Sequence, residues 1–317
     1  MSRVLVTGGA GFIGSHVIRD LIANDRAVTV LDDFSTGRRQ NLDGVGGDLR
    51  VVEGSILVPA DVENAMQDAV AVVHLAALPS VTRSVESPAE SHAACATGTV
   101  TVLDAARKRG LRVVYAGSSS AYGDQDVPAK HEALRESPLS PYAAAKLSGE
   151  LYCRAFARVY GMTIVVTRFF NVYGPRQVPD SPYSGVVAAF CFALLKGRGP
   201  RIDGDGSQSR DFTFVGDVAR GVRLAALGDV PPGCHTINLA GGHAYSVRDL
   251  YATLQEVAGV QIAPVEGPPR VGDVKHSLAD VTAARSLLGF ATKVSFADGL
   301  RKTFDWYRAT YAPETSR

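Results

Sequence analysis

The sequence predicts an α/β fold in which a doubly wound parallel sheet is accompanied by a smaller α/β lobe. Three observations support this class. Short apolar runs alternate with segments of helical spacing through the first half of the 317-residue chain. The runs are apolar throughout rather than at every second residue, as expected for strands that helices cover on both faces. A glycine-rich loop separates the first apolar run from the first helical segment.

The elements of the sheet are expected in order along the chain. Strands are predicted at Val4–Thr7, Val28–Leu31, Leu49–Glu53, Ala71–Leu75, Arg112–Gly117 and Thr163–Phe169. Helices between them are predicted at His16–Ala23, Val62–Gln67, Glu90–Lys108 and Pro141–Tyr160. Because the strands alternate with helices, the sheet is expected to be parallel.

Beyond Asn171 the composition changes, and we expect a smaller lobe to begin. Pro175–Ser209 is rich in Gly, Pro, Asp and Ser, with one expected helix at Gly185–Lys196. The later segments comprise Val215–Ala226 and His235–Leu239, which return to the sheet, and Ser246–Ala258 and Phe296–Thr310, which belong to the lobe. The predicted sheet domain therefore spans residues 1–171 plus about 215–240, and the lobe spans 172–214 and 241–317.

Composition and charge exclude several classes of protein. Lys plus Arg number 33 and Asp plus Glu number 32, so nothing draws the chain as a whole to nucleic acid or to an anionic membrane. The four cysteines lie far apart in sequence, which predicts no metal site and fits a reducing compartment. The chain has neither a signal-peptide pattern nor an apolar run long enough to span a bilayer. We expect a cytoplasmic protein.

The glycine-rich loop reads Thr-Gly-Gly-Ala-Gly-Phe-Ile-Gly from Thr7. Glycines at positions 8, 11 and 14 allow a tight turn and a close approach of the backbone to a pyrophosphate. The amides at the start of the following helix would face its negative charge. This context of strand, loop and helix predicts a Rossmann-type dinucleotide site. The alternative is a glycine turn that binds no nucleotide.

An acid at the end of the second predicted strand indicates which dinucleotide is bound. Asp32 lies 21 residues past Gly11, and Asp33 follows it. A carboxylate there hydrogen-bonds ribose hydroxyls and repels a 2′-phosphate, which favours NAD over NADP. Arg38 and Arg39 are close enough in sequence to leave NADP open.

Tyr142 and Lys146 are four residues apart on one predicted helix, so their side chains share a face. Pro141 suits the first turn of that helix, and Ser140 suits its N-cap. A nearby ammonium, together with an oxidised nicotinamide ring, favours a phenolate that can act as a base. The alternative is a Tyr and a Lys on a solvated helix face.

Three serines, Ser118, Ser119 and Ser120, follow the predicted strand Arg112–Gly117. The carboxyl end of such a strand opens onto the ligand crevice of a doubly wound sheet. A hydroxyl there can bind the reacting oxygen of a substrate and pass its proton to Tyr142. The alternative is a serine-rich turn.

Seven motifs occur in an order that resembles the extended short-chain dehydrogenase/reductase family. They are Val-Thr-Gly-Gly-Ala-Gly-Phe-Ile-Gly from Val6, His-Leu-Ala-Ala from His74, Ser-Ser-Ser-Ala-Tyr-Gly from Ser118, Ser-Pro-Tyr-Ala-Ala-Ala-Lys from Ser140, Arg-Phe-Phe-Asn-Val-Tyr-Gly-Pro-Arg-Gln from Arg168, Gly-Asp-Gly-Ser-Gln-Ser-Arg-Asp-Phe from Gly204 and Arg-Val-Gly-Asp-Val from Arg270. The resemblance covers nearly the whole chain. It points to the NAD-dependent nucleotide-sugar epimerase/dehydratase branch and is strongest to UDP-hexose 4-epimerases.

The resemblance implies a tightly held NAD that is not consumed overall. It implies Tyr142 as the catalytic base, supported by Lys146, and Ser118 as the first choice of relay hydroxyl, with Ser119 and Ser120 as alternatives. The implied cofactor-binding residues are Gly8, Gly11, Phe12, Ile13, Gly14, Asp32, Asp33, Ser35, Thr36, Gly37, Ser55, Ile56, Leu75, Ala76, Ala77, Pro79, Tyr142 and Lys146. The implied residues for the UDP-sugar are Asn171, Val187, Arg201, Arg210, Arg270 and Asp273.

Three positions depart from the family pattern. Ser55 stands where the family usually has an acid near the adenine, which weakens that contact. Cys95 stands where an Asn is common near the nicotinamide. Pro79 stands where several members have a polar residue. None of these departures removes the proposed chemistry.

The residues after Gly117 favour one reaction of the branch. Dehydratases of the family carry an Asp-Glu pair there, and decarboxylases usually keep a Glu, whereas this chain has Ser-Ser-Ala. Without those groups, a transient 4-keto sugar can only turn and be reduced on its other face. We therefore expect 4-epimerisation of a UDP-hexose. The alternatives are a 4,6- or 5,6-dehydratase with other acid and base groups, and a non-catalytic NAD-binding regulator.

The sugar and the assembly are less closely determined. Val178–Leu195 contains no Arg or Lys, which favours UDP-glucose/galactose or the N-acetylhexosamine pair and leaves UDP-glucuronate possible. A homodimer is expected from the resemblance, through the helices Glu90–Lys108 and Pro141–Tyr160. The second helix carries Leu147, Leu151 and Ala155 at four-residue spacing, although this stripe could equally face the sheet.

Overall fold

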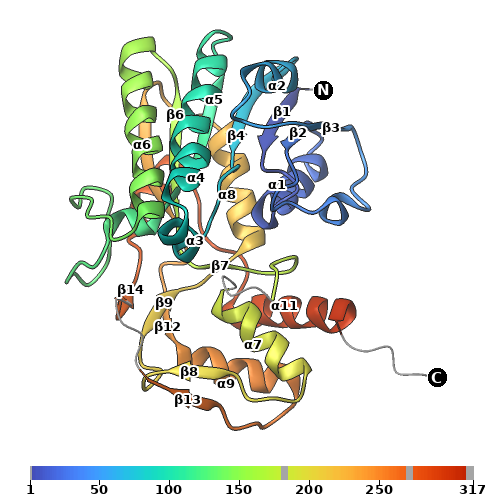
Figure 1. Cartoon of the computed structure of the whole chain (residues 1–317), viewed down its shortest axis with the longest axis vertical. Coiled ribbons are helices and arrows are strands. Elements are labelled where there is room, and N and C mark those ends of the chain that lie inside the picture. Colours follow the sequence, from blue (N-terminus) through green and yellow to red (C-terminus); the bar gives the residue numbers. More distant parts are fainter. Residues whose placement is uncertain (1, 180–184, 269–273, 312–317) are drawn as a thin grey trace.

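The computed structural model describes residues 2–179, 185–268 and 274–311. Seven strands form one sheet in the order β3-β2-β1-β4-β5-β6-β11, and every neighbouring pair is parallel. The strands are β1 Arg3–Thr7, β2 Ala27–Asp32, β3 Leu49–Glu53, β4 Ala69–His74, β5 Arg112–Ser118, β6 Ile164–Phe169 and β11 Cys234–Leu239. The predicted doubly wound parallel sheet is confirmed (Figure 1).

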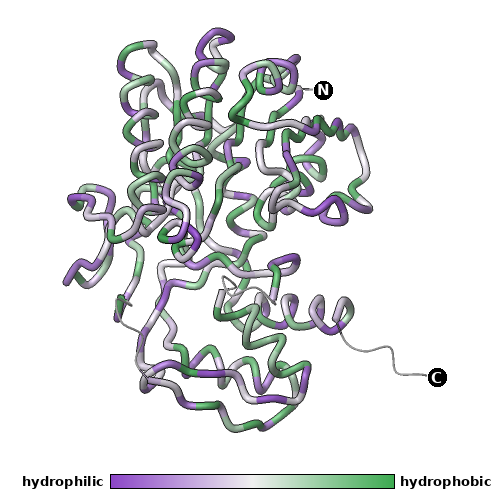
Figure 2. The backbone as a smooth tube through the Cα atoms, in the orientation of Figure 1, coloured by the Kyte–Doolittle hydropathy of each residue, from purple (hydrophilic) through white to green (hydrophobic). Residues whose placement is uncertain are grey.

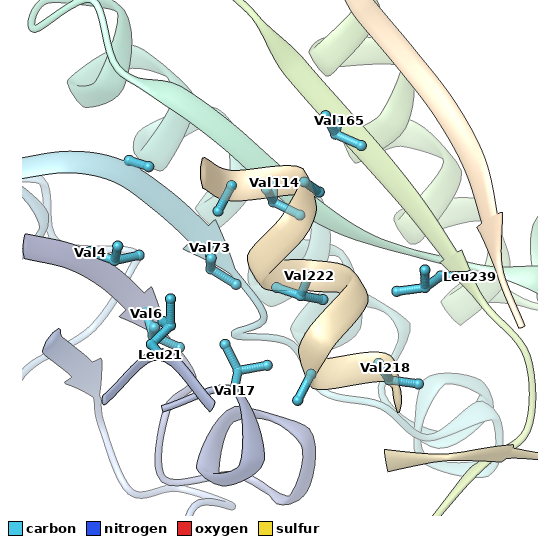
Figure 3. Packing of buried hydrophobic residues seen from close by; sticks show 14 of the residues in the cluster. Val4, Val6, Val17, Leu21, Val73, Val114, Val165, Val218, Val222 and Leu239 are labelled. Carbon is cyan, nitrogen blue, oxygen red and sulfur yellow. The ribbon is translucent and has the colours of Figure 1, made fainter. Parts of the chain in front are cut away.

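Helices cover both faces of the sheet. On one face, α1 (Phe12–Ala23) and α8 (Val215–Leu227) pack on the strands through a core of small branched side chains. Figure 3 shows this core, with Val17 and Val222 facing Val73 and Val114 of the central strands. The other face carries α2 (Pro59–Ala65), α5 (Gly98–Arg107) and α6 (Pro141–Tyr160). Figure 2 shows hydrophilic residues gathered on the outer turns.

Two predicted elements differ from the structure. Val215–Ala226 was expected to return to the sheet, and it does so as a helix on one face, because its apolar residues recur at helical spacing. Glu90–Lys108 was expected to be one helix. It is instead α4 (Pro88–His92), a π-helical turn η2 (Ala93–Thr97) and α5. The π-turn packs beside α6, and π-turns inside helices are often found at functional sites.

The second part of the chain builds a lobe with its own hydrophobic core. Its small sheets pair β7 (Val172–Tyr173) with β10 (Thr213–Phe214), β8 (Arg201–Asp203) with β13 (Val265–Gly267), and β9 (Ser209–Asp211) with both β12 (Ala244–Ser246) and β14 (His276–Ser277). Its helices are α7 (Val186–Leu195), α9 (Val247–Ala258) and α11 (Phe296–Tyr311). The remaining elements of the chain are η1 (Arg39–Leu42), α3 (Val81–Glu86), η3 (Ser119–Tyr122) and α10 (Thr282–Leu288).

The lobe lies beyond the carboxyl ends of the sheet strands (Figure 1). The chain enters it directly from the end of β6, through Asn171 and β7. Ligands of doubly wound sheets bind at this edge, and the lobe lies against it. Over the described ranges, no helix combines the length and apolarity needed to cross a membrane.

Candidate active site

The glycine loop packs directly against the segment that follows β4. Gly8 adopts a positive φ of 69°, and a Cβ there would lie 2.7 Å from Ala76 N. A Cβ on Gly14 would overlap the carbonyl oxygen of Gly8. Gly11 is the N-cap of α1 and offers no side-chain acceptor to the amides of the first turn. The loop therefore needs bare Cα atoms, and Phe12, Ile13 and their neighbours present N–H groups to an anion.

Asp32 fixes this loop from the end of β2. Its carboxylate is buried and accepts hydrogen bonds from Ala10 N (2.8 Å) and Phe34 N (2.9 Å). Burial raises the pKa of Asp32, and these two hydrogen bonds partly offset that effect. A Cβ on Gly37 would lie 2.6 Å from the Asp32 carboxylate, so the two predicted residues are brought together.

The groups around Asp32 differ in exposure. Asp33 is exposed and accepts hydrogen bonds from the backbone and hydroxyl of Ser35, with Thr36 exposed beside them. Arg39, which left NADP open, donates to Glu53 at the end of β3 and lies over the Phe34 ring. Because the Arg39 guanidinium is paired with Glu53, it is not placed to bind a 2′-phosphate. This arrangement favours NAD over NADP.

An acid that was not predicted from the sequence, Asp61, lies beside the end of β3. The Ser55 backbone donates to the Asp61 carboxylate (2.9 Å), and the Ser55 hydroxyl accepts from Leu57 N. Asp61 stands in the first turn of α2, just after Pro59. A Pro followed by an acid is the sequence signal of a helix start. A carboxylate therefore lies beside the position where the family acid is replaced by Ser55.

The other predicted cofactor residues lie on two neighbouring segments. Ile56 is largely buried and packs in the core under α5. The backbone of Leu75 donates to Thr7 O, and the backbone of Ala76 donates to the Thr7 hydroxyl. Ala77 and Pro79 follow in the same partly exposed segment before α3. The structure thus brings the ends of β1 and β4 together at the glycine loop.

Tyr142 and Lys146 share one face of α6, as predicted. Ser140 caps the helix by accepting from Ala143 N (3.1 Å), and Pro141 occupies the first turn. Lys146 is 4% exposed, and its Nζ lies 4.5 Å from the centre of the Tyr115 ring. Within the described residues, no side chain or carbonyl accepts a hydrogen bond from this ammonium. A buried ammonium with three donors to satisfy fits the ribose hydroxyls of a dinucleotide.

The side chains of Tyr142 and Ser118 lie near enough to each other to interact. Burial raises the pKa of Tyr142, Cys95 nearby raises it further, and the Ser118 side chain lowers it. Burial likewise lowers the pKa of Lys146. The sequence suggested that the ammonium would favour phenolate, but burial outweighs it in the chain alone. Deprotonation therefore needs a further positive charge at the site.

The three serines are not equivalent. Ser118 ends β5 and caps η3, and its Oγ accepts hydrogen bonds from the backbone (3.2 Å) and hydroxyl (2.8 Å) of Ser120. Ser120 therefore acts on Tyr142 only through Ser118, and Ser119 begins the turn of η3. Of the three, Ser118 is best placed to exchange a proton with Tyr142.

Cys95 and His74 are both buried near Lys146. Cys95 stands in the π-turn η2, where Thr99 donates to its carbonyl oxygen (2.7 Å). Because the Thr99 proton is used in this way, His74 Nε2 must donate to Thr99 (3.0 Å), and His74 Nδ1 then accepts from Thr7 (2.7 Å). Burial lowers the pKa of His74 to about 3, so the ring is neutral. The chain of bonds joins β1, β4 and α5 beneath the catalytic pair.

The predicted substrate residues are distributed over the lobe. Asn171 is exposed between β6 and β7, and Arg210 lies on β9 with its side chain bonded to Ser209 O and Lys275 O. Arg201 is exposed on β8 beside Asp203. The Val187 side chain is buried in the lobe core, so only its backbone can reach a ligand. Arg270 and Asp273 lie outside the described residues.

Comparisons with known proteins extend over nearly the whole chain. The sequence model of the NAD dependent epimerase/dehydratase family matches residues 4–240. A UDP-glucose 4-epimerase of Mycolicibacterium smegmatis is 38% identical over 311 residues, covering 96% of this chain and 98% of the relative. A dTDP-glucose 4,6-dehydratase of an Actinoplanes species is 34% identical over 319 residues, covering 97% and 98%.

A solved structure gives the same fold. The UDP-N-acetylglucosamine 4-epimerase from Methanobrevibacter ruminantium M1, in complex with UDP-N-acetylmuramic acid, superposes with a TM-score of 0.92. It is 36% identical, and the match covers 97% of this chain and 98% of that one. Because these similar proteins carry out different reactions, the residues of the site must decide between them.

Proposed function

The chain belongs to the NAD-dependent epimerase/dehydratase family, and we propose that it inverts C4 of a UDP-hexose through a transient 4-keto sugar. One observation carries the choice of reaction. Ser118 and Tyr142 lie near each other as a candidate proton pair, while the residues that follow Ser118 are Ser119, Ser120 and Ala121. An elimination of water would need an acid and a base beside that pair.

Three carboxylates on nearby segments have other partners. Glu150 and Glu136 are both held by the guanidinium of Arg168, and Glu132 accepts from the backbone of Asn238. None of these three is hydrogen-bonded to the serines of η3. The geometry therefore supports proton removal and return at one oxygen, without elimination.

The roles of the residues follow from their contacts. Ser118 binds the 4-oxygen of the sugar and passes its proton to Tyr142, and the same pair returns a proton after the sugar has turned. Lys146 directs its unsatisfied ammonium to ribose hydroxyls and holds positive charge beside Tyr142. When bound, NAD accepts the C4 hydride and gives it back. The glycine loop, Asp32 and Asp33 hold the adenosine half of the cofactor.

The substrate side belongs to the lobe. Asn171, Arg210 and Arg270 bind the diphosphate, because a guanidinium offers paired donors to phosphate oxygens. Asp273, Arg201 and the backbone at Val187 complete the nucleotide site. We take a neutral hexose, UDP-glucose/galactose or the N-acetylhexosamine pair, as the substrate, with UDP-glucuronate as the alternative. In this division residues 1–171 and about 215–240 bind NAD, residues 172–214 and 241–317 bind the UDP-sugar, and the protein works in the cytoplasm.

A homodimer is proposed on the exposed face of α6. In the predicted stripe Leu151 is 51% exposed, Ala155 is exposed and Leu147 is half-buried, so the stripe does not face the sheet. Val85 on the neighbouring helix α3 is also exposed. Pairing these helices with those of a second copy would bury the stripe. Light scattering at micromolar concentration should give a dimer mass that Leu151→Glu abolishes and Val265→Glu, a control in the lobe, does not.

The reaction is tested with the purified protein and no added cofactor. UDP-glucose, UDP-N-acetylglucosamine and UDP-glucuronate are incubated separately, and the products are resolved by anion exchange and NMR. We expect interconversion at C4 with one of the neutral sugars. Loss of water from the product would establish the dehydratase, and turnover of UDP-glucuronate alone would overturn the choice of a neutral sugar. Unaltered turnover by Tyr142→Phe would overturn the catalytic assignment.

A further inference from the structure

Arg168 begins the Arg-Phe-Phe-Asn motif, of which the proposed reaction uses only Asn171. Its side chain is completely buried. We propose that Arg168 is a positioning residue, which holds the Ser118 hydroxyl against the Tyr142 hydroxyl by tying together the two elements that carry them. The proposal rests on the proposed function in so far as Ser118 and Tyr142 form its proton pair.

The first tie runs from Arg168 to the catalytic helix. Arg168 Nε donates to Glu150 Oε2 (3.0 Å) and Arg168 Nη2 donates to Glu150 Oε1 (2.5 Å). Glu150 is 1% exposed and stands on α6 at four-residue spacing from Lys146 and eight from Tyr142. All three therefore lie along one face of the helix. A bidentate pair of this kind fixes orientation as well as distance.

The second tie runs from Arg168 to the turn that carries the serines. Its guanidinium lies over the Tyr122 ring, 4.5 Å from the ring centre. Tyr122 is buried and ends η3, the turn that Ser118 caps, and its hydroxyl donates to Asn238 (2.6 Å). Arg168 is also the β6 partner of Gly117, the residue before Ser118.

A third set of contacts closes the segment between η3 and α6. Glu136 lies in that segment and accepts from Arg168 (2.8 Å) and from Arg154 on α6 (2.7 Å). Burial alone lowers the pKa of Arg168, but Glu150 and Tyr122 raise it above its ordinary value, so the group stays charged. Arg168 Nη1 is buried and has no hydrogen-bond partner among the described residues. The guanidinium instead contacts the Tyr122 ring that it lies over.

The geometry separates positioning from simple stability. Removing one member of a buried pair leaves an uncompensated charge and destabilises the fold, whereas replacing both members by neutral groups is often tolerated. The test therefore uses the double variant Arg168→Met/Glu150→Gln. The matched control is Arg223→Met/Asp20→Asn, which removes a partly buried pair between α8 and α1 on the opposite face of the sheet.

The first readout is kinetic, on the NAD-loaded protein. We expect the double variant to lower kcat by about 100-fold, the effect of a misplacement of roughly 1 Å. Bound NAD and KM should stay within threefold, and the control should match the native protein. Ser118→Ala should lower kcat strongly in the native chain. It should lower kcat hardly further in the double variant, because there Ser118 is already misaligned with Tyr142. The proposal would be overturned if the effects of Ser118→Ala and of the double variant on kcat were fully additive, or if the double variant kept the native kcat.

The second readout needs no turnover, so it separates this proposal from the proposed function. A crystal structure of the double variant with NAD should show the Ser118 and Tyr142 hydroxyls farther apart than in the native protein, with α6 and η3 displaced relative to each other. If the double variant fails to fold, Arg168→Lys keeps the charge but loses the fork, and the same displacement is expected to a smaller extent. Retention of the native distance between the Ser118 and Tyr142 hydroxyls in the folded variant contradicts the role assigned to Arg168.

Discussion

Replacing Gly8 by Ala tests how the glycine loop binds the cofactor. Gly8 has a φ of 69°, and its missing Cβ would lie 2.7 Å from Ala76 N and 2.8 Å from Ala76 Cα. Both neighbours are backbone atoms and cannot swing aside. Ordinary contacts begin near 3.4 Å, so the loop must retreat by roughly 0.7 Å.

The cost of this change has two parts. A left-handed conformation costs an Ala about 1 kcal/mol relative to Gly. Crowding against the Ala76 backbone adds about 1–3 kcal/mol. A domain of ordinary stability survives this loss. Displaced loop amides would lose one or two hydrogen bonds to the pyrophosphate, at about 1.5–3 kcal/mol each. We therefore expect NAD affinity to fall by about 10- to 100-fold or more.

Gly110 provides a matched control. It has a φ of 62°, but a Cβ there would meet no atom within 4 Å. Gly110 precedes β5 and so lies at the amino ends of the parallel strands, whereas Gly8 follows β1 and lies at their carboxyl ends. Gly110→Ala should show the conformational cost alone, with native NAD binding.

The assay compares two quantities for each variant. Isothermal titration of cofactor-free protein gives the NAD affinity, and thermal unfolding gives the stability. Gly8→Ala should lose affinity far beyond Gly110→Ala, and its loss of stability should exceed that of Gly110→Ala by the crowding cost of about 1–3 kcal/mol. Equal NAD affinity in the two variants would refute the close approach of the loop to the pyrophosphate.

Three further predictions follow from the same geometry. Ser118→Ala should lower kcat by about 100-fold and Ser120→Ala by less than tenfold, because Ser118 influences the Tyr142 phenol and Ser120 is bonded to Ser118; equal losses in steady-state kinetics would contradict the relay. Lys146→Met should weaken NAD binding as well as kcat, since its ammonium has no acceptor in the described chain; native affinity by titration would contradict that role. The pKa of His74 falls from 6.5 to about 3 on folding and that of His16 to about 4, so the unfolded chain binds more protons between these values. The contribution of these two histidines to stability is thus complete above pH 6.5 and is lost as the pH falls toward 3. His74→Asn should therefore flatten the fall of the melting temperature between pH 7 and 5. An unchanged slope of melting temperature against pH would refute a neutral buried His74.

The strands were predictable because each is a short apolar run bounded by turn residues. All six strands predicted before the lobe are present, with ends shifted by one or two residues. The π-turn at Ala93–Thr97 was not predictable, because its apolar residues still fit a continuous helical stripe. It arises from packing against α6, where Gly149 approaches the Cys95 carbonyl.

The site was predictable where a local pattern carries the chemistry. The loop glycines and the Tyr142–Lys146 spacing belong to this kind. The Arg168–Glu150 pair and the His74–Thr99 bond join residues far apart in sequence, so only the fold reveals them.

The central claim is that this site inverts C4 and changes nothing else. Its most direct test is the reaction of the NAD-loaded protein with UDP-glucose and with UDP-N-acetylglucosamine in D₂O, followed by mass spectrometry and NMR of the product. The account predicts the C4 epimer of one of these sugars, with unchanged mass and no deuterium on carbon, because the hydride removed from C4 is the one returned. A product lighter by one water, or deuterium at C5 or C6, would contradict it.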